Sequence, residues 1–467
     1  MHRALALRAA PRAPHGGVSA LCAAGRHRFH SLGVSAELVE RLRAMGISTP
    51  SAAQLRAIPL VLQRQHDVVV AAETGGGKTL AYLIPMLERL RDHPLPVHEI
   101  HRPVALVLTA SQELVGQIHA VFQQLDANTA RAIVALSSTQ QQLPSRGRAC
   151  AVLVATPKSL LRATQPKDFA FTQLLVVDEA DMLLGGGFER DTKQIVATIR
   201  NQPLKKAHLN TTSRRDDNDE LHPQDDSLAD DARQTVFKYA TIPDYGKRSV
   251  HDFIQYKFPN AQFAITDDFQ RTLPQLDVAV HRLEDYTPSD ADPDEARNKL
   301  VLEILEQSRG CEGHTLVFAN SIESADALHG FLTTSLTEMP ADNVLLFHKE
   351  VPRDTRHEIL RRLQQSDTKL VVVCTDIAAR GLDTTRVGHV VQYEFANDVV
   401  SYIHRIGRTA RAGASGKVSS IVGPENALVV SKIDEAGGDS LHGAFSRKRS
   451  LRKKVKKLRR ASDTHRQ

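Results

Sequence analysis

Short apolar runs rich in valine recur along the chain and alternate with longer amphipathic segments. Each half holds one series of runs, which start at residues 67, 104, 132, 151, 174 and 235 in the first half and at 314, 343, 369, 387 and 417 in the second. Apolar runs separated by helix-length segments predict parallel sheets covered by helices. A chain of 467 residues is also too long for one ordinary core. The pattern therefore predicts an α/β protein with two domains.

A stretch rich in proline and acidic residues separates the two series. It covers residues 283–299 and predicts a linker. We expect one domain over residues 29–282 and a second over residues 300–440. The first domain would carry an acidic insertion at about residues 203–232, which has the composition of a disordered loop. Self-solvation is one interpretation of this insertion, and an autoinhibitory mimic of RNA is another.

Basic residues gather at the two ends of the chain. Residues 1–28 hold five arginines and no acid, as in organellar targeting segments, and scarce serine favours the mitochondrion over the plastid. A basic arm without a targeting role is the alternative. Residues 446–460 hold ten basic residues and no acid. We expect residues 441–467 to form an RNA-binding tail, with a nuclear-localisation signal or a solvated tail as the other interpretations. The expected RNA contacts in this tail are Lys448, Arg449, Arg452 and Lys453.

A glycine-rich loop follows the run at residue 67 and leads into a helix-length segment. Glycines allow backbone N–H groups to surround phosphate oxygens, with the N-terminus of a helix behind them. We expect Lys78 to reach the β- and γ-phosphates of a nucleotide and the Thr79 hydroxyl to bind Mg²⁺. A glycine-rich turn with a chance lysine is the alternative. The expected nucleotide-binding residues are Thr74, Gly75, Gly76, Gly77, Lys78 and Thr79.

Three carboxylates, Asp178, Glu179 and Asp181, follow the apolar run at residue 174. Buried charge is costly without a partner, and ligands bind at the carboxyl ends of parallel strands. We therefore expect these acids to face the phosphate loop. Asp178 would hold Mg²⁺ through water, and Glu179 would orient and deprotonate the attacking water. ATP and Mg²⁺ are the predicted cofactors.

Residues 178–181 read Asp-Glu-Ala-Asp, and the chain resembles the DEAD-box RNA-dependent ATPases of helicase superfamily 2 over roughly residues 29–440. The resemblance implies two tandem RecA-like domains, each with a parallel sheet flanked by helices, joined by a short linker. It implies that Phe29 stacks on adenine and that the Gln54 amide pairs with the edges of the base.

The second half resembles the fifth and sixth motifs of that family. The resemblance implies that Thr375 contacts RNA and that Asp383 contacts ATP. Arg408 and Arg411 lie three residues apart, so we expect both guanidinium groups on one helical face, where they would act as arginine fingers. Bridges to surface acids are the alternative role for these arginines.

Several motifs depart from the family pattern, mostly in RNA binding and coupling. The third motif, usually Ser-Ala-Thr, has Tyr at its first position. Three other altered motifs read Ala110-Ser111-Gln112-Glu113-Leu114, Thr156-Pro157-Lys158-Ser159 and Ser137-Ser138. In a further motif, Arg353 stands three residues before Arg356, where the family usually has Gln. Loss of a charged phosphate contact lowers the affinity for RNA. We still expect RNA contacts from Thr156 and Arg356. The residues expected to couple hydrolysis to RNA are Asp181, Tyr239, Thr241 and His404, with the Tyr239 hydroxyl acting from further out than a serine.

Together with these patterns, the resemblance implies a monomeric helicase that hydrolyses ATP when RNA closes its domains and that unwinds or remodels structured RNA. Likeness of "GGGFERDT", "YATIPDYGKRSVHDFI" and "FSRKRSLRKKVKKLRR" to plant-type organellar DEAD-box helicases implies a role in ribosomal RNA maturation, with ribosome-assembly proteins as further partners. Alternatives are an RNA clamp or scaffold with weak unwinding, a nuclear or nucleolar helicase, and a DNA-directed ATPase. No apolar run approaches a membrane span, so we expect no membrane partner.

Overall fold

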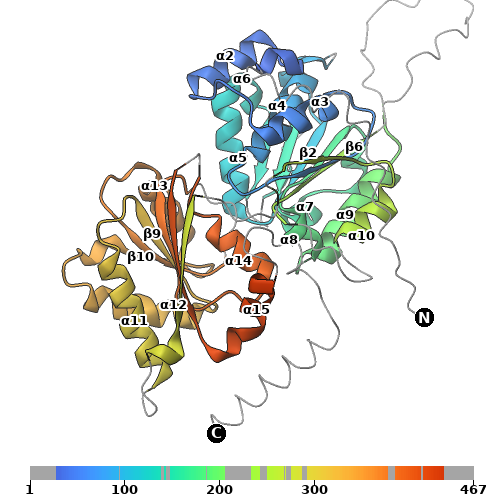
Figure 1. Ribbon diagram of the computed structural model, residues 1–467. Coiled ribbons are helices and arrows are strands. Elements are labelled where there is room, and N and C mark those ends of the chain that lie inside the picture. Colours follow the sequence, from blue (N-terminus) through green and yellow to red (C-terminus); the bar gives the residue numbers. More distant parts are fainter. Residues whose placement is uncertain are drawn as a thin grey trace, which may run out of the picture.

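The protein is described by a computed structural model that covers residues 28–435, except residues 94, 138–140, 144–147, 186, 206–232, 242–249, 268, 270–274, 287–291, 377–383 and 412–413. Most of the predicted targeting segment, the core of the acidic insertion and the whole basic tail lie outside the described residues. In Figure 1 the first domain runs from blue to yellow-green and the second from yellow to red.

The first domain contains a seven-stranded sheet in the order β3-β4-β2-β5-β6-β1-β7, with every pair of neighbours parallel. Its strands are β1 Val68–Ala71, β2 Ala105–Leu108, β3 Ile133–Leu136, β4 Val152–Ala155, β5 Leu174–Val177, β6 Gln234–Tyr239 and β7 Gln262–Ile265. Its helices are α2 Ala36–Ala44, α3 Ala52–Leu62, α4 Lys78–Arg91, α5 Gln112–Leu125, α6 Ala127–Ala130, α7 Pro157–Ala163, α8 Ala180–Gly185, α9 Glu189–Asn201 and α10 Val250–Lys257.

Side chains of each strand alternate between two cores, one on each face of this sheet. On β1, Val68 and Val70 join the core beneath α2 to α5, whereas Val69 and Ala71 join the core beneath α7 to α10. Strands β1, β2, β4 and β5 are buried along their whole length. Such strands need apolar side chains on both faces, which explains the continuous valine-rich runs in the sequence.

The second domain contains a six-stranded parallel sheet in the order β10-β11-β9-β12-β13-β8. Its strands are β8 Leu276–Arg282, β9 His314–Phe318, β10 Val344–Phe347, β11 Val371–Cys374, β12 Val387–Gln392 and β13 Gly416–Val422. Its helices are α11 Pro293–Gln307, α12 Ile322–Ser335, α13 Arg353–Gln365, α14 Val399–Ile406 and α15 Ala427–Glu435. The structure thus confirms the prediction of two parallel sheets flanked by helices.

The predicted domain boundary is wrong. Strand β8 lies within the range predicted for the first domain, 29–282, but it pairs with β13 along seven residues of the second sheet. Helix α11 begins at Pro293, inside the predicted linker 283–299. The chain therefore leaves the first sheet after Ile265 and enters the second at Leu276. Within the part of the chain that the structure describes, no helix is both long and apolar enough to cross a membrane.

Candidate active site between the two domains

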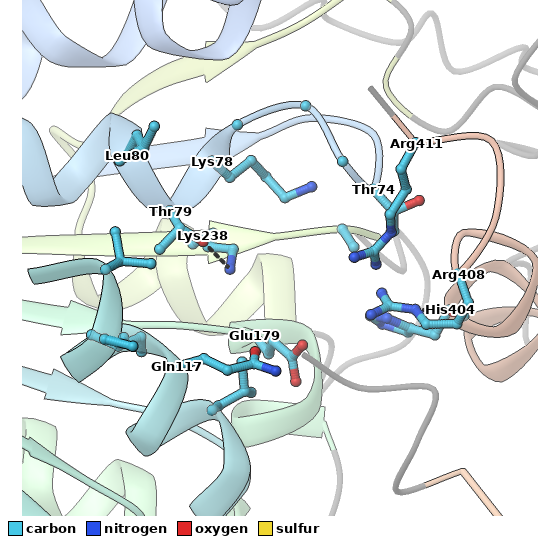
Figure 2. A pocket seen from close by; sticks show the side chains of 18 of the residues that line it. Thr74, Lys78, Thr79, Leu80, Gln117, Glu179, Lys238, His404, Arg408 and Arg411 are labelled. Carbon is cyan, nitrogen blue, oxygen red and sulfur yellow. Dashed lines mark hydrogen bonds between the residues drawn. The ribbon is translucent and has the colours of Figure 1, made fainter. Parts of the chain in front are cut away.

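A cavity of about 430 Å³ lies between the two domains. It opens where β1, β5 and β6 end, because the segments that follow these strands contribute to its wall. Figure 2 shows side chains of the first domain facing those of the second across this space. The lining residues that carry charge or a side-chain hydroxyl include Thr74, Lys78, Thr79, Glu179 and Lys238 from the first domain and His404, Arg408 and Arg411 from the second.

The phosphate loop joins β1 to α4, which begins at Lys78. Gly75 and Gly77 have φ angles of 83° and 75°, in the left-handed region that favours glycine. The Gly76 N–H donates to the Glu73 carbonyl, which closes the turn. The loop and the first residues of α4 line the cavity, and the first N–H groups of a helix have no intrahelical partner, so this arrangement suits an anion.

Lys78 lies inside this loop with 7% of its surface exposed. Its ammonium donates to the carbonyl oxygens of Ala72 at 2.6 Å and Glu73 at 2.5 Å. Burial, with the charge of Lys238, lowers the pKa of Lys78 from 10.5 to about 7. Burying the charged form of Lys78 in the loop costs free energy, and an anionic ligand bound beside it would reduce that cost.

Asp178 directly follows β5 and is fully buried, with one polar group near each of its carboxylate oxygens. The Tyr82 hydroxyl donates to Oδ2 at 2.8 Å, and the Lys238 ammonium lies 2.5 Å from Oδ1. The same ammonium is 3.5 Å from the Thr79 hydroxyl oxygen. Hydroxyl and carboxylate oxygens are ligands that Mg²⁺ prefers, so the donor set fits that metal, but a lysine lies between the donors. Lys238 is not predicted from the sequence, because it stands alone within an apolar run.

Glu179 follows directly and has a φ of 53°, which is strained for a residue with a side chain. The carboxyl group lines the cavity, and its Oε2 atom has no hydrogen-bond partner among the described residues. Burial raises the pKa of Glu179, opposed by the charge of His404. A carboxylate with an open lone pair and a raised pKa is suited to accept a proton from a water molecule in the cavity.

Asp181 connects the first domain to the second. Its Oδ2 atom accepts from the Thr241 hydroxyl at 2.7 Å and from the Thr241 N–H at 3.1 Å, and it lies 3.2 Å from the His404 Nε2 atom. Burial alone would raise the pKa of Asp181, but the charge of His404 and the hydrogen bonds outweigh it and lower the pKa to about 2. Three of the four residues expected to couple hydrolysis to RNA, namely Asp181, Thr241 and His404, therefore meet at one carboxylate.

Tyr239, the fourth of these residues, packs in the core at 1% exposure. Burial and the charge of Asp181 raise its pKa well above 10. The backbone and hydroxyl of Thr241 make the contact to Asp181, so the bulky residue at the start of this motif does not prevent the link.

Arg408 and Arg411 both reach the cavity from the second domain, but the predicted helical face is wrong. Helix α14 ends at Ile406, so both arginines lie beyond the helix, Arg408 in the turn that follows it and Arg411 in the loop after that turn. The Arg408 Nε atom donates to the His404 carbonyl at 3.1 Å, and the Arg411 Nε atom donates to the Gly407 carbonyl at 3.0 Å. Gly407 lies so close to Thr74 that an added Cβ would be 2.0 Å from the threonine hydroxyl oxygen.

The predicted adenine contacts do not line this cavity. The Phe29 ring is 1% exposed and belongs to the core cluster that contains Leu38 and Ile58. The Gln54 amide accepts from the Ser51 N–H at 2.9 Å and donates to the Gly77 carbonyl at 3.1 Å. Stacking by Phe29 is therefore wrong for this conformation, because no face of the ring is open. Gln54 instead braces the phosphate loop.

Arg356, expected to contact RNA, forms a salt bridge across the domains. Its Nη2 atom lies 3.1 Å from Oε1 of Glu113, and both residues are buried. The neighbouring Arg353 donates to the Ser137 hydroxyl at 2.8 Å. In the conformation described the Arg356 guanidinium contacts the first domain, and its contact with RNA stays a prediction.

The other residues singled out in the sequence lie at different places in the fold or outside the described residues. Thr156 directly precedes α7 and is buried, with its hydroxyl donating to the Ser159 hydroxyl at 3.0 Å. Thr375 follows β11 and is half-buried. Asp383 and the four basic residues of the tail lie outside the described residues.

Comparison with known proteins identifies two family models that match this chain. The model described as DEAD/DEAH box helicase matches residues 51–244, and the model described as helicase conserved C-terminal domain matches residues 296–413. DEAD-box ATP-dependent RNA helicase 22 of Oryza sativa subsp. japonica is 30% identical over 502 residues, which cover 92% of this chain and 84% of the rice protein. The protein of that name in Arabidopsis thaliana is 28% identical over 506 residues, covering 92% and 83% of the two chains.

Two solved structures have the same fold. The DEAD-box helicase Mss116 bound to ssRNA and UDP-BeF aligns with a TM-score of 0.70 at 21% identity, over 92% of this chain and 82% of that one. S. cerevisiae Dbp5 bound to RNA and ADP BeF3 aligns with a TM-score of 0.67 at 22% identity, over 93% and 100% of the two chains. These likenesses confirm the predicted pair of RecA-like domains.

Proposed function

Because the chain belongs to the family of DEAD-box ATP-dependent RNA helicases, we propose that RNA draws its two domains together around ATP and that this closure gates hydrolysis. RNA helicase activity with ATP and Mg²⁺ follows from family membership. The gating proposal rests on the composite cavity, since Lys78 and Glu179 come from one domain while Arg408 and Arg411 come from the other. Neither domain holds both sets of groups.

Each set of side chains suits one part of the reaction. Glu179 would take the proton of the attacking water, and Lys78 and the loop N–H groups would hold the phosphates. Arg408 and Arg411 would neutralise charge that develops on the transferring phosphoryl group. Mg²⁺, when bound, supplies further positive charge to the phosphate oxygens. The bond between Asp181 and His404 exists only when the domains are together, so it favours the closed state in which these groups face one another.

The gating proposal is tested by measuring ATP turnover of the full chain with single-stranded RNA, with DNA of the same length and sequence, and without polynucleotide. We expect RNA to raise turnover at least about tenfold, as for a step that needs a conformational closure, and DNA to have little effect. Equal turnover in all three conditions would contradict gating by RNA. Equal stimulation by DNA would instead support a DNA-directed ATPase.

We further propose that the protein acts on ribosomal RNA in an organelle, most simply the mitochondrion. Support comes from the acid-free, arginine-rich residues 1–28 and the basic residues 446–460. The first composition is that of an import segment, and the second suits binding to a phosphate backbone. Structured ribosomal RNA and assembly proteins would then be the partners.

Localisation of the full chain, tagged at its C-terminus, tests this proposal. A matched variant would replace the five N-terminal arginines by glutamine, at Arg3, Arg8, Arg12, Arg26 and Arg28. We expect mitochondrial signal for the natural sequence and its loss in the variant. Nuclear signal for both would contradict the organellar proposal. Crosslinking to RNA in cells, followed by sequencing, should recover ribosomal RNA.

A second candidate function is an ATP-dependent RNA clamp that unwinds poorly. It is favoured by the Gln112 substitution and by the use of Arg356 for domain contact. The two functions differ in duplex molecules opened per ATP hydrolysed. A clamp would open few duplexes yet hold single-stranded RNA for a long time with a non-hydrolysable ATP analogue.

A further inference from the structure

Lys238 places a positive charge in the wall of the cavity. It lies on β6, between the strand that leads to the phosphate loop and the strand that ends at the acids. Its side chain faces the cavity beside Thr79, as Figure 2 shows, and only 9% of the residue is exposed. A lysine inside a central parallel strand is rare, because the ammonium must be compensated where water is scarce.

The compensation comes from the carboxylate that the catalytic metal is expected to use. The Lys238 Nζ atom lies 2.5 Å from Asp178 Oδ1 and 3.5 Å from the Thr79 hydroxyl oxygen. The other oxygen of Asp178 accepts from the Tyr82 hydroxyl. The two side chains that fit a Mg²⁺ ion are thus already bridged by an ammonium that belongs to the protein.

We propose that Lys238 is a built-in cation that takes part of the place and part of the charge of Mg²⁺, so that nucleotide binding depends only weakly on the metal. The proposal rests on nucleotide binding in this cavity. Diphosphate and triphosphate groups held by the loop would meet the Lys238 ammonium, which can donate to phosphate oxygens without any metal. A divalent ion beside the ammonium would be repelled, so metal affinity would fall at the same time.

A purely structural ion pair between Lys238 and Asp178 is the competing explanation. Such a pair would influence folding stability but would leave the metal dependence of nucleotide binding unchanged. The discriminating quantity is the ratio of two dissociation constants for ADP, measured with excess EDTA and with excess Mg²⁺. A low ratio means that the protein itself supplies the positive charge that the metal usually brings.

The test compares the full chain with Lys238→Met, which keeps the length of an unbranched side chain and removes its charge. Titration of a fluorescent ADP analogue gives the two dissociation constants for each protein. We expect EDTA to weaken binding by less than about tenfold in the natural chain, and the ratio to be about tenfold larger in the variant, because one nearby charge is lost. Lys193→Met, a matched charge removal on α9 at a side chain that pairs with Glu189, should leave the ratio unchanged.

Manganese binding gives a second readout. The affinity of Mn²⁺ for the ADP complex, measured by electron paramagnetic resonance, should rise in Lys238→Met. Equal ratios and equal Mn²⁺ affinities in both proteins would overturn the proposal.

If the variant does not fold, the natural chain alone decides. A loss of affinity greater than about a hundredfold on adding EDTA would mean that Lys238 does not replace the metal charge. Absence of ADP binding even with Mg²⁺ would refute the nucleotide site itself and the present proposal with it, a result distinct from a high ratio.

Discussion

The salt bridge between Glu113 and Arg356 should control how readily the domains close. The two residues come from different domains, and both are nearly excluded from water when the domains meet. In an open arrangement each charge would be hydrated separately. Replacing Glu113 by glutamine would leave Arg356 without its counter-charge. Because Arg356 is buried only when the domains meet, the substitution would raise the free energy of the closed state and not that of the open state.

The expected size of this effect is large. Removing one partner of a buried ion pair costs about 3–5 kcal/mol. The Arg356 guanidinium keeps a second bond, from Nη1 to the Lys349 carbonyl at 2.8 Å, so we take the lower end of that range. A penalty of about 3 kcal/mol corresponds to a loss on the order of a hundredfold in the closed population.

The assay is energy transfer between one dye on each domain, measured with RNA and a non-hydrolysable ATP analogue. We expect Glu113→Gln to require on the order of a hundredfold more ligand to close, with RNA binding in the absence of nucleotide unchanged. The double variant Glu113→Gln with Arg356→Gln should recover part of the loss, because no lone charge remains. Glu338→Gln, at an exposed pair with Arg309 inside the second domain, is the control and should change closure by less than about 1 kcal/mol.

Two results would refute this reasoning. The first is additive effects of Glu113→Gln and Arg356→Gln, which would mean that the two side chains do not act on each other. The second is weaker RNA binding by Arg356→Gln without nucleotide, with a salt dependence reduced by about one charge, which would mean that Arg356 contacts phosphate.

Three further outcomes are expected at the cavity. Glu179→Gln should lower ATP turnover by about 10²–10⁴-fold, because the proton acceptor is lost, while the dissociation constant for ATP changes little; rapid-quench kinetics with a binding titration measure both, and turnover at the natural rate would exclude Glu179 as the base. Binding of ADP at pH 8 should take up close to one proton, because the pKa of Lys78 is about 7 in the free protein and bound phosphate raises it. This proton uptake should vanish at pH 6, where Lys78 is already charged. Calorimetry in two buffers of different ionisation enthalpy measures the number of protons taken up. No uptake at pH 8 would contradict the lowered pKa of Lys78. Asp181→Asn, which weakens the bond to His404, should retain ADP binding but lose most of the stimulation of turnover by RNA, and unchanged stimulation would show that this bond does not couple the domains.

The sequence predicted the sheets well because buried parallel strands leave a strong local pattern. Four fully buried residues in a row, as in β1 and β5, require apolar side chains on both faces. The placement of site residues also followed, since the loop and the acids stand where strands end, at one edge of a sheet. Lys78, Glu179 and Arg411 line one cavity although they are far apart in the chain.

Features that depend on packing between distant elements could not be predicted. Nothing in the local pattern around Arg356 indicates that Glu113 will meet it, and Phe29 reads equally well as a ligand contact or as a core residue. Strand β8 resembles any other strand, and only its pairing with β13 assigns it to the second sheet. Lys238 was overlooked because one lysine hardly alters an apolar run, although its burial is unusual.

The entry of the chain into the second sheet at Leu276 sets a limit on how far the two cores can part. Ten residues, 266–275, join the last strand of one sheet to the first strand of the other. Even fully stretched, such a tether spans at most about 40 Å. A short tether keeps each lobe at an effective concentration in about the millimolar range for its neighbour. Closure of the cavity is thus a first-order process whose rate does not depend on protein concentration. Its ligands only have to shift the equilibrium between an open and a closed arrangement of two domains that stay linked.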